Sequence, residues 1–283
     1  MHWLIFAAIS VIVGSCGNIV RRRMMSHDAS DPMIVAVLFQ IGAGILTGSY
    51  ALLHGFHAAP IVKYWPNYII MTIGWTISTY CVYVVYKYIE AGEATLLGSL
   101  SSVVSIFGGV YVLHEIFSFQ NVIGVIFILA AVVIIALENM KHFKVNKGFY
   151  YAIASSLFAG IAIINDTYML RASDGPSQLA LAFLIPGILL LLLQFKKVVF
   201  TLHHHKRDFW GRIVLQSTLS SISAGSYYIA LDIGAPASQL SPIGQSSIIF
   251  TVILGMVFLG ERKHVAKKLT CAGLVFIGVL LLG

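Results

Sequence analysis

Ten long apolar stretches run through this sequence, and short polar or basic stretches separate them. Each has close to the ~20 residues that a helix needs to cross a hydrocarbon core of about 30 Å. A segment inside a membrane must also satisfy its backbone hydrogen bonds internally, which favours helices. The pattern predicts ten membrane-spanning helices: Trp3–Val20, Pro32–Leu53, Tyr68–Ile89, Ala94–Leu113, Phe119–Leu137, Phe149–Leu170, Gln178–Phe195, Trp210–Leu231, Pro236–Leu259 and Ala266–Leu282.

The second half of the chain repeats the first. A spacing of 146 residues aligns 100–115 with 246–261 without a gap, and the third predicted helix aligns with the eighth at 144 residues. A fixed period indicates a repeated structural unit. We therefore predict two units, residues 1–140 and 147–283. The matched pairs at the longer spacing are Ser101 and Ser247, Ser105 and Thr251, Gly109 and Gly255, Leu113 and Leu259, Glu115 and Glu261, Ser10 and Ser156, and Gly14 and Gly160.

The number of helices in each unit decides how the two units are oriented. Five is odd, so the second unit must enter the membrane from the side opposite to the first. Such an inverted repeat is typical of transporters that alternate around a central site. The predicted fold class is therefore all-α, with ten transmembrane helices in two inverted five-helix repeats.

The composition supports a membrane protein and indicates no enzyme. Hydrophobic residues make up 58% of the chain and charged residues 10%, whereas a soluble surface alone carries about 25–35% charged positions. The three cysteines lie in apolar stretches and form no disulfide or metal-binding pattern. No nucleophile elbow, phosphate-binding glycine loop or metalloprotease motif is present. We therefore expect no cofactor and no metal.

The net charge of +7 reflects topology rather than nucleic-acid binding, because the basic residues alternate between loops. Counted from the N-terminus, the odd-numbered loops hold 16 of the 18 Lys and Arg. Cytoplasmic loops carry such an excess. The prediction is a multi-pass protein of the cell membrane with both termini outside. The basic residues of the odd loops are Arg21, Arg22, Arg23, Lys87, Lys141, Lys144, Lys147, Lys196, Lys197, Lys206, Arg207, Arg212, Arg262, Lys263, Lys267 and Lys268.

A polar face on the third predicted helix is the first candidate for a substrate site. Its hydroxyl residues recur at steps of three and four, which places them on one side of a helix. A polar stripe facing lipid is disfavoured, so this face should meet protein or water. Hydroxyls that join helices, at about 0.6 kcal/mol each, are the alternative. The candidates are Thr72, Trp75, Thr76, Thr79 and Tyr83, with Gln216, Ser220, Ser223 and Tyr227 at the repeat positions of the eighth helix.

The fourth and ninth helices carry a second matched polar face. Its candidate members are Ser101 and Ser105 in the first half, with Ser247 in the second. Gln245 follows a Pro-Gly interruption of the ninth helix, where freed backbone groups can bind a ligand. A kink without any ligand is the more frequent consequence of such an interruption.

Asp166 is the candidate coupling residue. It lies near the end of the sixth predicted helix, and ionisable residues within membrane segments are functional candidates by default. An interfacial ion pair with Arg171, about one turn further on, is the alternative interpretation. Neither interpretation requires a metal or a cofactor.

The ends of the fourth and ninth helices suggest a family. The sequences VLHE at Val112 to Glu115 and FLGE at Phe258 to Glu261, together with the duplication, resemble EamA-type members of the drug/metabolite transporter superfamily. The resemblance implies a ten-helix transporter and favours export. The position of Glu115 and Glu261 at helix ends suits capping of the next helix or pairing with loop cations.

The sequence therefore predicts a transporter that moves a small neutral, zwitterionic or amphipathic metabolite, amino-acid-like or drug-like, by alternating access. Its expected partners are this solute and the lipid bilayer, with no nucleic acid, and the sequence predicts no particular oligomeric state. The alternatives are a facilitative sugar or nucleoside uptake carrier or channel, and a membrane protein without transport activity.

Overall fold

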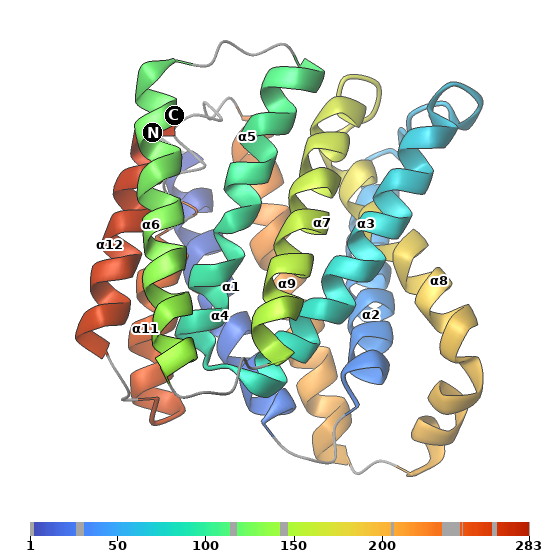
Figure 1. Ribbon diagram of the computed structural model, residues 1–283. Coiled ribbons are helices and arrows are strands. Elements are labelled where there is room, and N and C mark those ends of the chain that lie inside the picture. Colours follow the sequence, from blue (N-terminus) through green and yellow to red (C-terminus); the bar gives the residue numbers. More distant parts are fainter. Residues whose placement is uncertain are drawn as a thin grey trace.

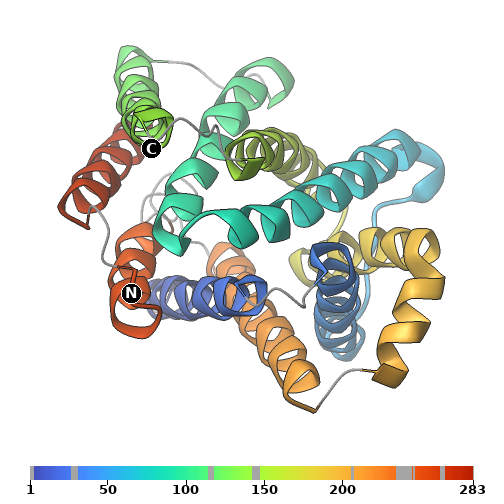
Figure 2. The same ribbon diagram turned by 60° about the horizontal axis from the view of Figure 1, so that its bottom comes forward.

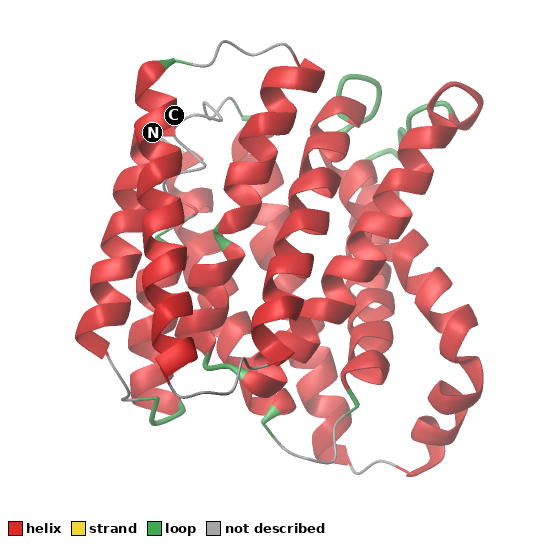
Figure 3. Cartoon of the chain, in the orientation of Figure 1, coloured by secondary structure: helices red, strands yellow, loops and turns green. Residues whose placement is uncertain are grey.

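The computed structural model describes residues 3–26, 31–113, 118–141, 147–204, 207–233, 244, 246–261 and 265–282. Within these ranges the regular structure is helical throughout, with no strand (Figure 3). The helices stand side by side as a bundle (Figure 1). They are α1 Trp3–Met25, α2 Pro32–Leu53, α3 Ile61–Tyr88, α4 Ala91–Gly98, α5 Leu100–Leu113, α6 Phe119–Lys141, α7 Lys147–Met169, α8 Gly175–His204, α9 Arg207–Asp232, α11 Ser247–Phe258 and α12 Val265–Leu282.

The outer surface of the bundle is that of a membrane protein. Five helices, α1, α2, α3, α7 and α8, are long and apolar enough to cross a membrane among the residues described, and α11 is a shorter apolar helix. Large apolar side chains point outwards, with Leu53 83% and Val62 92% exposed. Lipid tails solvate such side chains, whereas buried polar groups find partners inside the protein. The chain is a multi-pass membrane protein.

The two halves of the chain pack against each other through matching pairs of helices. α1 packs along α9 and α11, and α7 packs along α3 and α5. α2 packs on α8, and α6 packs on α12. In the repeat, α1 corresponds to α7, α2 to α8, α3 to α9, α5 to α11 and α6 to α12. Under this exchange the contacts of α1 with α9 and α11 become those of α7 with α3 and α5, and the α2–α8 and α6–α12 pairs stay the same. Viewed from the end where α4 begins, α6 and α12 stand together at one side of the bundle (Figure 2).

Several helices have boundaries that differ from the expected ones, and the shifts in α3 and α8 are large. α3 begins at Ile61 rather than Tyr68 and has a non-helical residue, Tyr64, close to Pro66. α8 continues to His204, past the expected end at Phe195, with a kink at Gln194. No glycine or proline follows the kink, so nothing in that stretch breaks a helix.

The fourth predicted helix is interrupted instead of continuous. α4 ends at Gly98, and α5 begins at Leu100 after a turn at Ser99. The Ser99 hydroxyl donates to Leu96 O at 2.6 Å, which satisfies a carbonyl group near the break. The expected interruption of the ninth helix lies at residues 234–245, which fall outside the described residues apart from Gly244.

Candidate functional site

A cavity of about 220 Å³ lies inside the bundle, between three elements of the first half and one of the second. Both polar and apolar side chains form its wall, and the break between α4 and α5 contributes to it. Its polar lining residues are Asn18 and Arg21 from α1, Tyr86 from α3, Thr95 from α4, Ser99 after α4, and Ser155 and Ser156 from α7. Small or apolar residues complete it: Val82, Val85, Ala94, Gly98 and Ala152.

Arg21 is the charged group of this cavity. It lies in the last turns of α1, and three aromatic rings surround its guanidinium group. The guanidinium carbon lies 5.7 Å from the ring centre of Phe39 and 5.4 Å from those of Tyr83 and Tyr86. A cation within about 6 Å of an aromatic face is attracted by the ring. The rings of α2 and α3 therefore hold the charge at the cavity wall.

Hydrogen bonds fix the rest of the Arg21 side chain. Nη1 donates to Asn18 Oδ1 at 3.4 Å. With the Gln216 amide oriented to satisfy both of its atoms, Nε2 donates to Gly17 O at 2.7 Å and Oε1 accepts from Arg21 Nη2 at 3.1 Å. Arg21 Nε is buried and has no hydrogen-bond partner among the described residues. One donor of the guanidinium is therefore unused.

The predicted polar face of α3 does not line this cavity as one surface. Thr72 donates back to Tyr68 O at 2.6 Å, and Thr79 is half-buried. Thr76 is buried, and its hydroxyl has no hydrogen-bond partner in the described part of the chain. Tyr83 is fully buried and contacts Arg21. Tyr83 therefore lies behind the cavity wall, as a support for the charged group.

The matching face of α9 turns towards α1. Ser223 donates to Ser10 O at 2.8 Å, and Gln216 and Ser220 are within 3.1 Å of each other. Tyr227 packs beside a small apolar cluster of Ala7 and Ala230. These contacts join two helices, which is the alternative that the sequence left open for hydroxyl residues. Gln216 alone of this face also reaches the guanidinium of the cavity.

Ser101 and Ser247, the described candidates of the fourth and ninth helices, are not among the lining residues of the cavity, and Ser101 lies just after the break between α4 and α5. The Ser101 hydroxyl donates to Gly98 O at 2.7 Å. Ser247 O accepts from the Ser15 hydroxyl at 3.2 Å. The side chain of Ser105 and the whole of Gln245 lie outside the described parts of the structure.

Asp166 is buried at the other end of the bundle. Its Oδ2 accepts from Trp75 Nε1 at 2.8 Å, and its Oδ1 accepts from Gln178 Nε2 at 3.0 Å. Arg171 instead lies against the Tyr168 ring, at 5.6 Å from the ring centre. Asp166 therefore joins α3, α7 and α8 through neutral donors, and these contacts differ from the ion pair that was the alternative.

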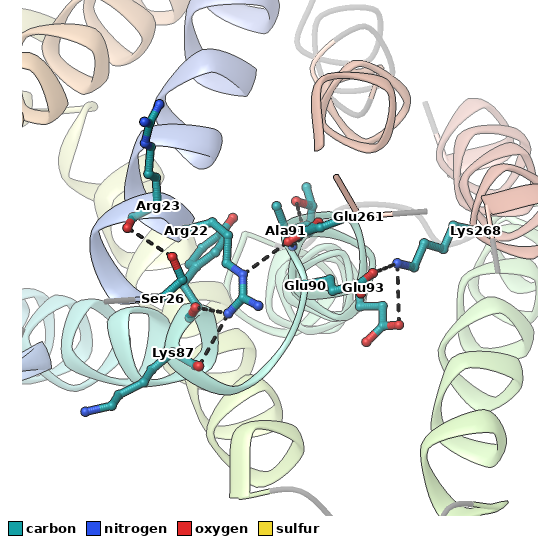
Figure 4. Close-up of polar contacts among 11 residues, drawn as sticks. Arg22, Arg23, Ser26, Lys87, Glu90, Ala91, Glu93, Glu261 and Lys268 are labelled. Atoms are coloured by element: carbon teal, nitrogen blue, oxygen red, sulfur yellow. Dashed lines mark hydrogen bonds and ion pairs between the residues drawn. The ribbon is translucent and has the colours of Figure 1, made fainter. Parts of the chain in front are cut away.

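Glu261 joins the two halves at the basic end of the bundle (Figure 4). Its carboxylate accepts from the backbone N–H of Ala91 at 2.9 and 3.1 Å and from Arg22 Nε at 3.1 Å. The expected role at a helix end is thus found, but the helix is α4 of the first half and not the next helix. Burial raises the pKa of the Glu261 carboxyl, against the opposing effect of Arg22.

The glycine of FLGE explains how Glu261 reaches this position. Gly260 has φ of +68°, a left-handed conformation that ends a helix and that glycine adopts without strain. The Glu261 N–H donates to Gly255 O at 3.2 Å, which closes the end of α11. The chain therefore turns sharply and presents the carboxylate to α4.

A second pair of contacts at this end involves Lys268. It is buried near the start of α12, 2% exposed, and its ammonium pairs with Glu90 and, at 3.6 Å, with Glu93. Glu90 and Glu93 were not among the candidate residues predicted from the sequence. Figure 4 shows both carboxylates on the α4 side, facing the Lys268 ammonium.

Arg21, the charged residue of the cavity wall, was not among the candidates predicted from the sequence. Arg21 was counted as a loop cation because the apolar run of the first helix stops at Val20. α1 in fact continues to Met25, so Arg21 points from a helix and not from a loop. Helix propensity was the available signal, since arginine and methionine are good helix formers.

A second hollow and possible metal-binding groups are weaker candidates for the functional site than this cavity. A hollow of about 310 Å³ between the start of α2 and the last turns of α8 is open at the surface, where Asp31, Lys196 and Lys197 line it. Within the described ranges, no group of three His, Cys, Asp or Glu residues could hold a metal ion. The cavity beside Arg21 is therefore the better candidate for a solute site.

Comparisons with known proteins agree with this architecture. The sequence model of the "EamA-like transporter family" matches residues 1–137 and again residues 146–283. A solved structure described only as "Crystal structure of protein" has a TM-score of 0.67 and 14% sequence identity to this chain. The superposition covers 99% of this chain and 96% of the other, and at this identity it shows the fold alone. No curated protein matches the chain.

Proposed function

The chain belongs to the EamA-like transporter family, and we propose that it moves a small neutral, zwitterionic or amphipathic metabolite by alternating access. The family comprises membrane transporters of small solutes rather than enzymes. The proposed direction is export, on the family resemblance. The observation that supports the proposal is the cavity, because α1, α3 and α4 of one half and α7 of the other line it together.

The proposed topology has ten spans in two inverted units, residues 1–140 and 147–283. Two observations support it: α1 begins and α12 ends at the same end of the bundle (Figure 1), and the helix pairs exchange when the halves are exchanged. We place the opposite end, with Arg22 and Lys268, in the cytoplasm because cytoplasmic loops are rich in basic residues. The termini are then outside the cell.

The closed contacts at this basic end suggest how access would alternate. Arg22 and Glu261 join α1, the end of α3 and the start of α4 to the loop between α11 and α12. Lys268 joins α12 to α4. Separating these pairs would open the cavity towards the cytoplasm. Such rocking of one repeat against the other is the usual motion of inverted-repeat transporters.

Gly98 allows a direct test of the cavity. A Cβ at this position meets no atom within 4 Å, so a larger side chain enters the cavity without colliding with the protein. We expect Gly98→Leu to fold normally but to reduce solute exchange by at least about tenfold. The measurement is counterflow in proteoliposomes with radiolabelled leucine, uridine, glucose and benzoate.

Gly273→Leu is the matched control. Gly273 is also a helical glycine with no atom within 4 Å of an added Cβ, but it lies in α12 and outside the cavity lining. It should exchange solute like the wild type. Equal exchange by Gly98→Leu and the wild type would remove the cavity from the transport pathway, and flux without counterflow would indicate a channel. No flux of any of these solutes would contradict the proposed function.

We further propose that Asp166 is the site where a proton couples to transport. A carboxyl group that changes charge inside the membrane alters the strength of the hydrogen bonds around it. Here those bonds reach Trp75 in the first half and Gln178 in the second. Protonation would therefore weaken a contact between the halves at the end opposite to Glu261.

The Asp166→Asn variant tests this coupling. Asparagine keeps an acceptor for one of the two donors but cannot change its charge with pH. We expect counterflow within about twofold of the wild type and loss of the accumulation that a pH gradient drives. Asp174→Asn is the control, because asparagine preserves the helix cap that Asp174 provides to Ser177. Unchanged pH-driven accumulation by Asp166→Asn would disprove the coupling role.

A further inference from the structure

We propose that Arg21 binds the anionic end of the transported solute, which is a small organic molecule with a single carboxylate. This inference rests on the proposed function, because it narrows the substrate class of the same cavity. It replaces a broad expectation of neutral, zwitterionic or amphipathic solutes with one required group.

The two neighbouring buried cations of this end each have a carboxylate partner. Arg22 pairs with Glu261, and Lys268 pairs with Glu90 and Glu93 (Figure 4). Arg21 has no carboxylate partner among the described residues, and its Nε has no hydrogen-bond partner there. The neighbouring basic residue Arg23 is exposed and solvated. Among the described residues, Arg21 is thus a cation that faces the cavity without a carboxylate partner.

An unpaired cation in this setting favours an anionic ligand. Removing a charge from water is costly unless an opposite charge or good hydrogen bonds replace the water. The three aromatic rings offset part of this cost and also hold the guanidinium in one orientation. A guanidinium can hold a carboxylate through two parallel hydrogen bonds. A carboxylate would supply the missing charge and an acceptor for the unused donor.

The remaining wall fits the body of a small solute. Val82, Val85 and Ala152 offer apolar surface, and the hydroxyl of Ser155 lies in the wall as a polar group. No acidic residue is among the described lining residues, so the wall provides no charge to attract a cation. At about 220 Å³ the cavity is smaller than the ~300–1,000 Å³ typical of sites for drug-sized ligands. The lining therefore favours a small anionic solute over a large lipophilic cation.

Matched probes separate charge from shape. Benzoate and benzamide have nearly the same shape, and only benzoate is an anion; phenylalanine and phenylalaninamide form a second pair. We expect each carboxylate, but not its amide, to raise the melting temperature of the detergent-purified protein. Inorganic phosphate and tetraphenylphosphonium complete the panel, as an anion without an organic body and as a lipophilic cation. Neither should stabilise the protein.

Arg21→Gln should abolish the carboxylate-dependent shift, and Arg23→Gln, which removes an exposed charge two residues away, should leave it unchanged. Arg21→Lys keeps the charge but loses the planar guanidinium, and we expect it to weaken benzoate binding about tenfold. Because Arg21→Lys retains a cation in the aromatic cage, it tests the proposal even if Arg21→Gln does not fold. A benzoate shift of wild-type size in Arg21→Lys, or any remaining shift in a folded Arg21→Gln, would show that Arg21 only joins helices.

The outcomes also distinguish this inference from the proposed function. Equal stabilisation by benzoate and benzamide, or no stabilisation by any carboxylate, overturns the anion site. If leucine, uridine or glucose is still exchanged in proteoliposomes and Gly98→Leu blocks that exchange, the transport function stands without the anion site. Arg21-dependent binding of benzoate without any flux would leave the anion site and contradict transport. Stabilisation by phosphate as strong as that by benzoate would assign the site to phosphate groups and overturn the carboxylate class.

Discussion

Glu261→Ala is expected to lower the free energy of unfolding by about 3 kcal/mol, because it removes one partner of a largely buried ion pair. The Arg22 and Glu261 side chains are 18% and 9% exposed. Without the carboxylate, the partners left to Arg22 among the described residues are the carbonyl groups of Tyr86 and Lys87. The N–H of Ala91 at the start of α4 also loses its acceptor. The measurement is unfolding in mixed micelles by titration with a denaturing detergent.

A double-mutant cycle identifies the cause of this loss. Glu261→Ala should cost clearly less in an Arg22→Ala background, because the unpaired cation is then absent. Glu261→Gln should fall between the wild type and alanine, since its amide oxygen still accepts from Ala91. Asp208→Ala removes an exposed carboxylate from α9 and should change stability by no more than about 0.5 kcal/mol. Additive effects of the Arg22 and Glu261 substitutions would show that the pair itself contributes nothing.

Gly160→Ala is expected to destabilise the protein by about 2 kcal/mol, because α7 and α5 touch at this glycine. An added Cβ would lie 2.5 Å from Val104 Cβ and 2.9 Å from the backbone carbonyl of Ser101. A backbone atom cannot rotate away, so the two helices must separate. The contact joins the first half to the second beside the break between α4 and α5. We therefore expect reduced solute exchange as well as reduced stability.

Gly14 provides a matched control from the repeat itself. It occupies the corresponding position of the first half, and there an added Cβ would meet the Ser223 hydroxyl at 2.7 Å. A hydroxyl can change rotamer, and alanine is a better helix former than glycine by about 1 kcal/mol. Gly14→Ala should therefore cost less than about 1 kcal/mol in the same titration. Equal costs at the two positions would refute the steric explanation.

Glu261 and Gly160 illustrate two kinds of contact between the two halves of the chain. Glu261 and Arg22 act through charge at the basic end, whereas Gly160 acts through close packing further into the bundle. A transporter that alternates must separate some contacts between halves while it keeps others. The charged contacts are the better candidates for separation, because water can replace their hydrogen bonds when that end opens.

The architecture was largely predictable from the sequence, because it depends on local properties. The length of apolar stretches predicts membrane helices, and the two aligned segments predict the duplication that the family match repeats over residues 1–137 and 146–283. The structure describes five helices that are clearly long enough to span, and the count of ten remains a prediction. The sequence predicted that Glu261 would cap a helix, but not that this helix would be α4 of the other half.

The cavity was not predictable in the same way. The hydroxyl pattern of α3 predicts a polar side of the helix, yet periodicity does not say which neighbour each side chain meets. Tyr83 supports Arg21, whereas Trp75 on the same helix contacts Asp166 at the other end. One helical face is thus divided between two centres. The candidate residues of the sequence remain predictions, and the cavity wall adds Asn18, Arg21 and Tyr86 to them.

The sequence by itself determined that this protein is helical, duplicated, inserted in a membrane and a member of a transporter family. Hydrophobicity and repeat spacing act along the chain, so they can be read without knowing which helices touch. Only the tertiary structure decided which charges pair and which one does not. Glu261 meets Ala91 across 170 residues and Arg22 across 239. Contacts at such separations depend on helix packing, which also places Arg21 beside a cavity where none of the described carboxylates pairs with it.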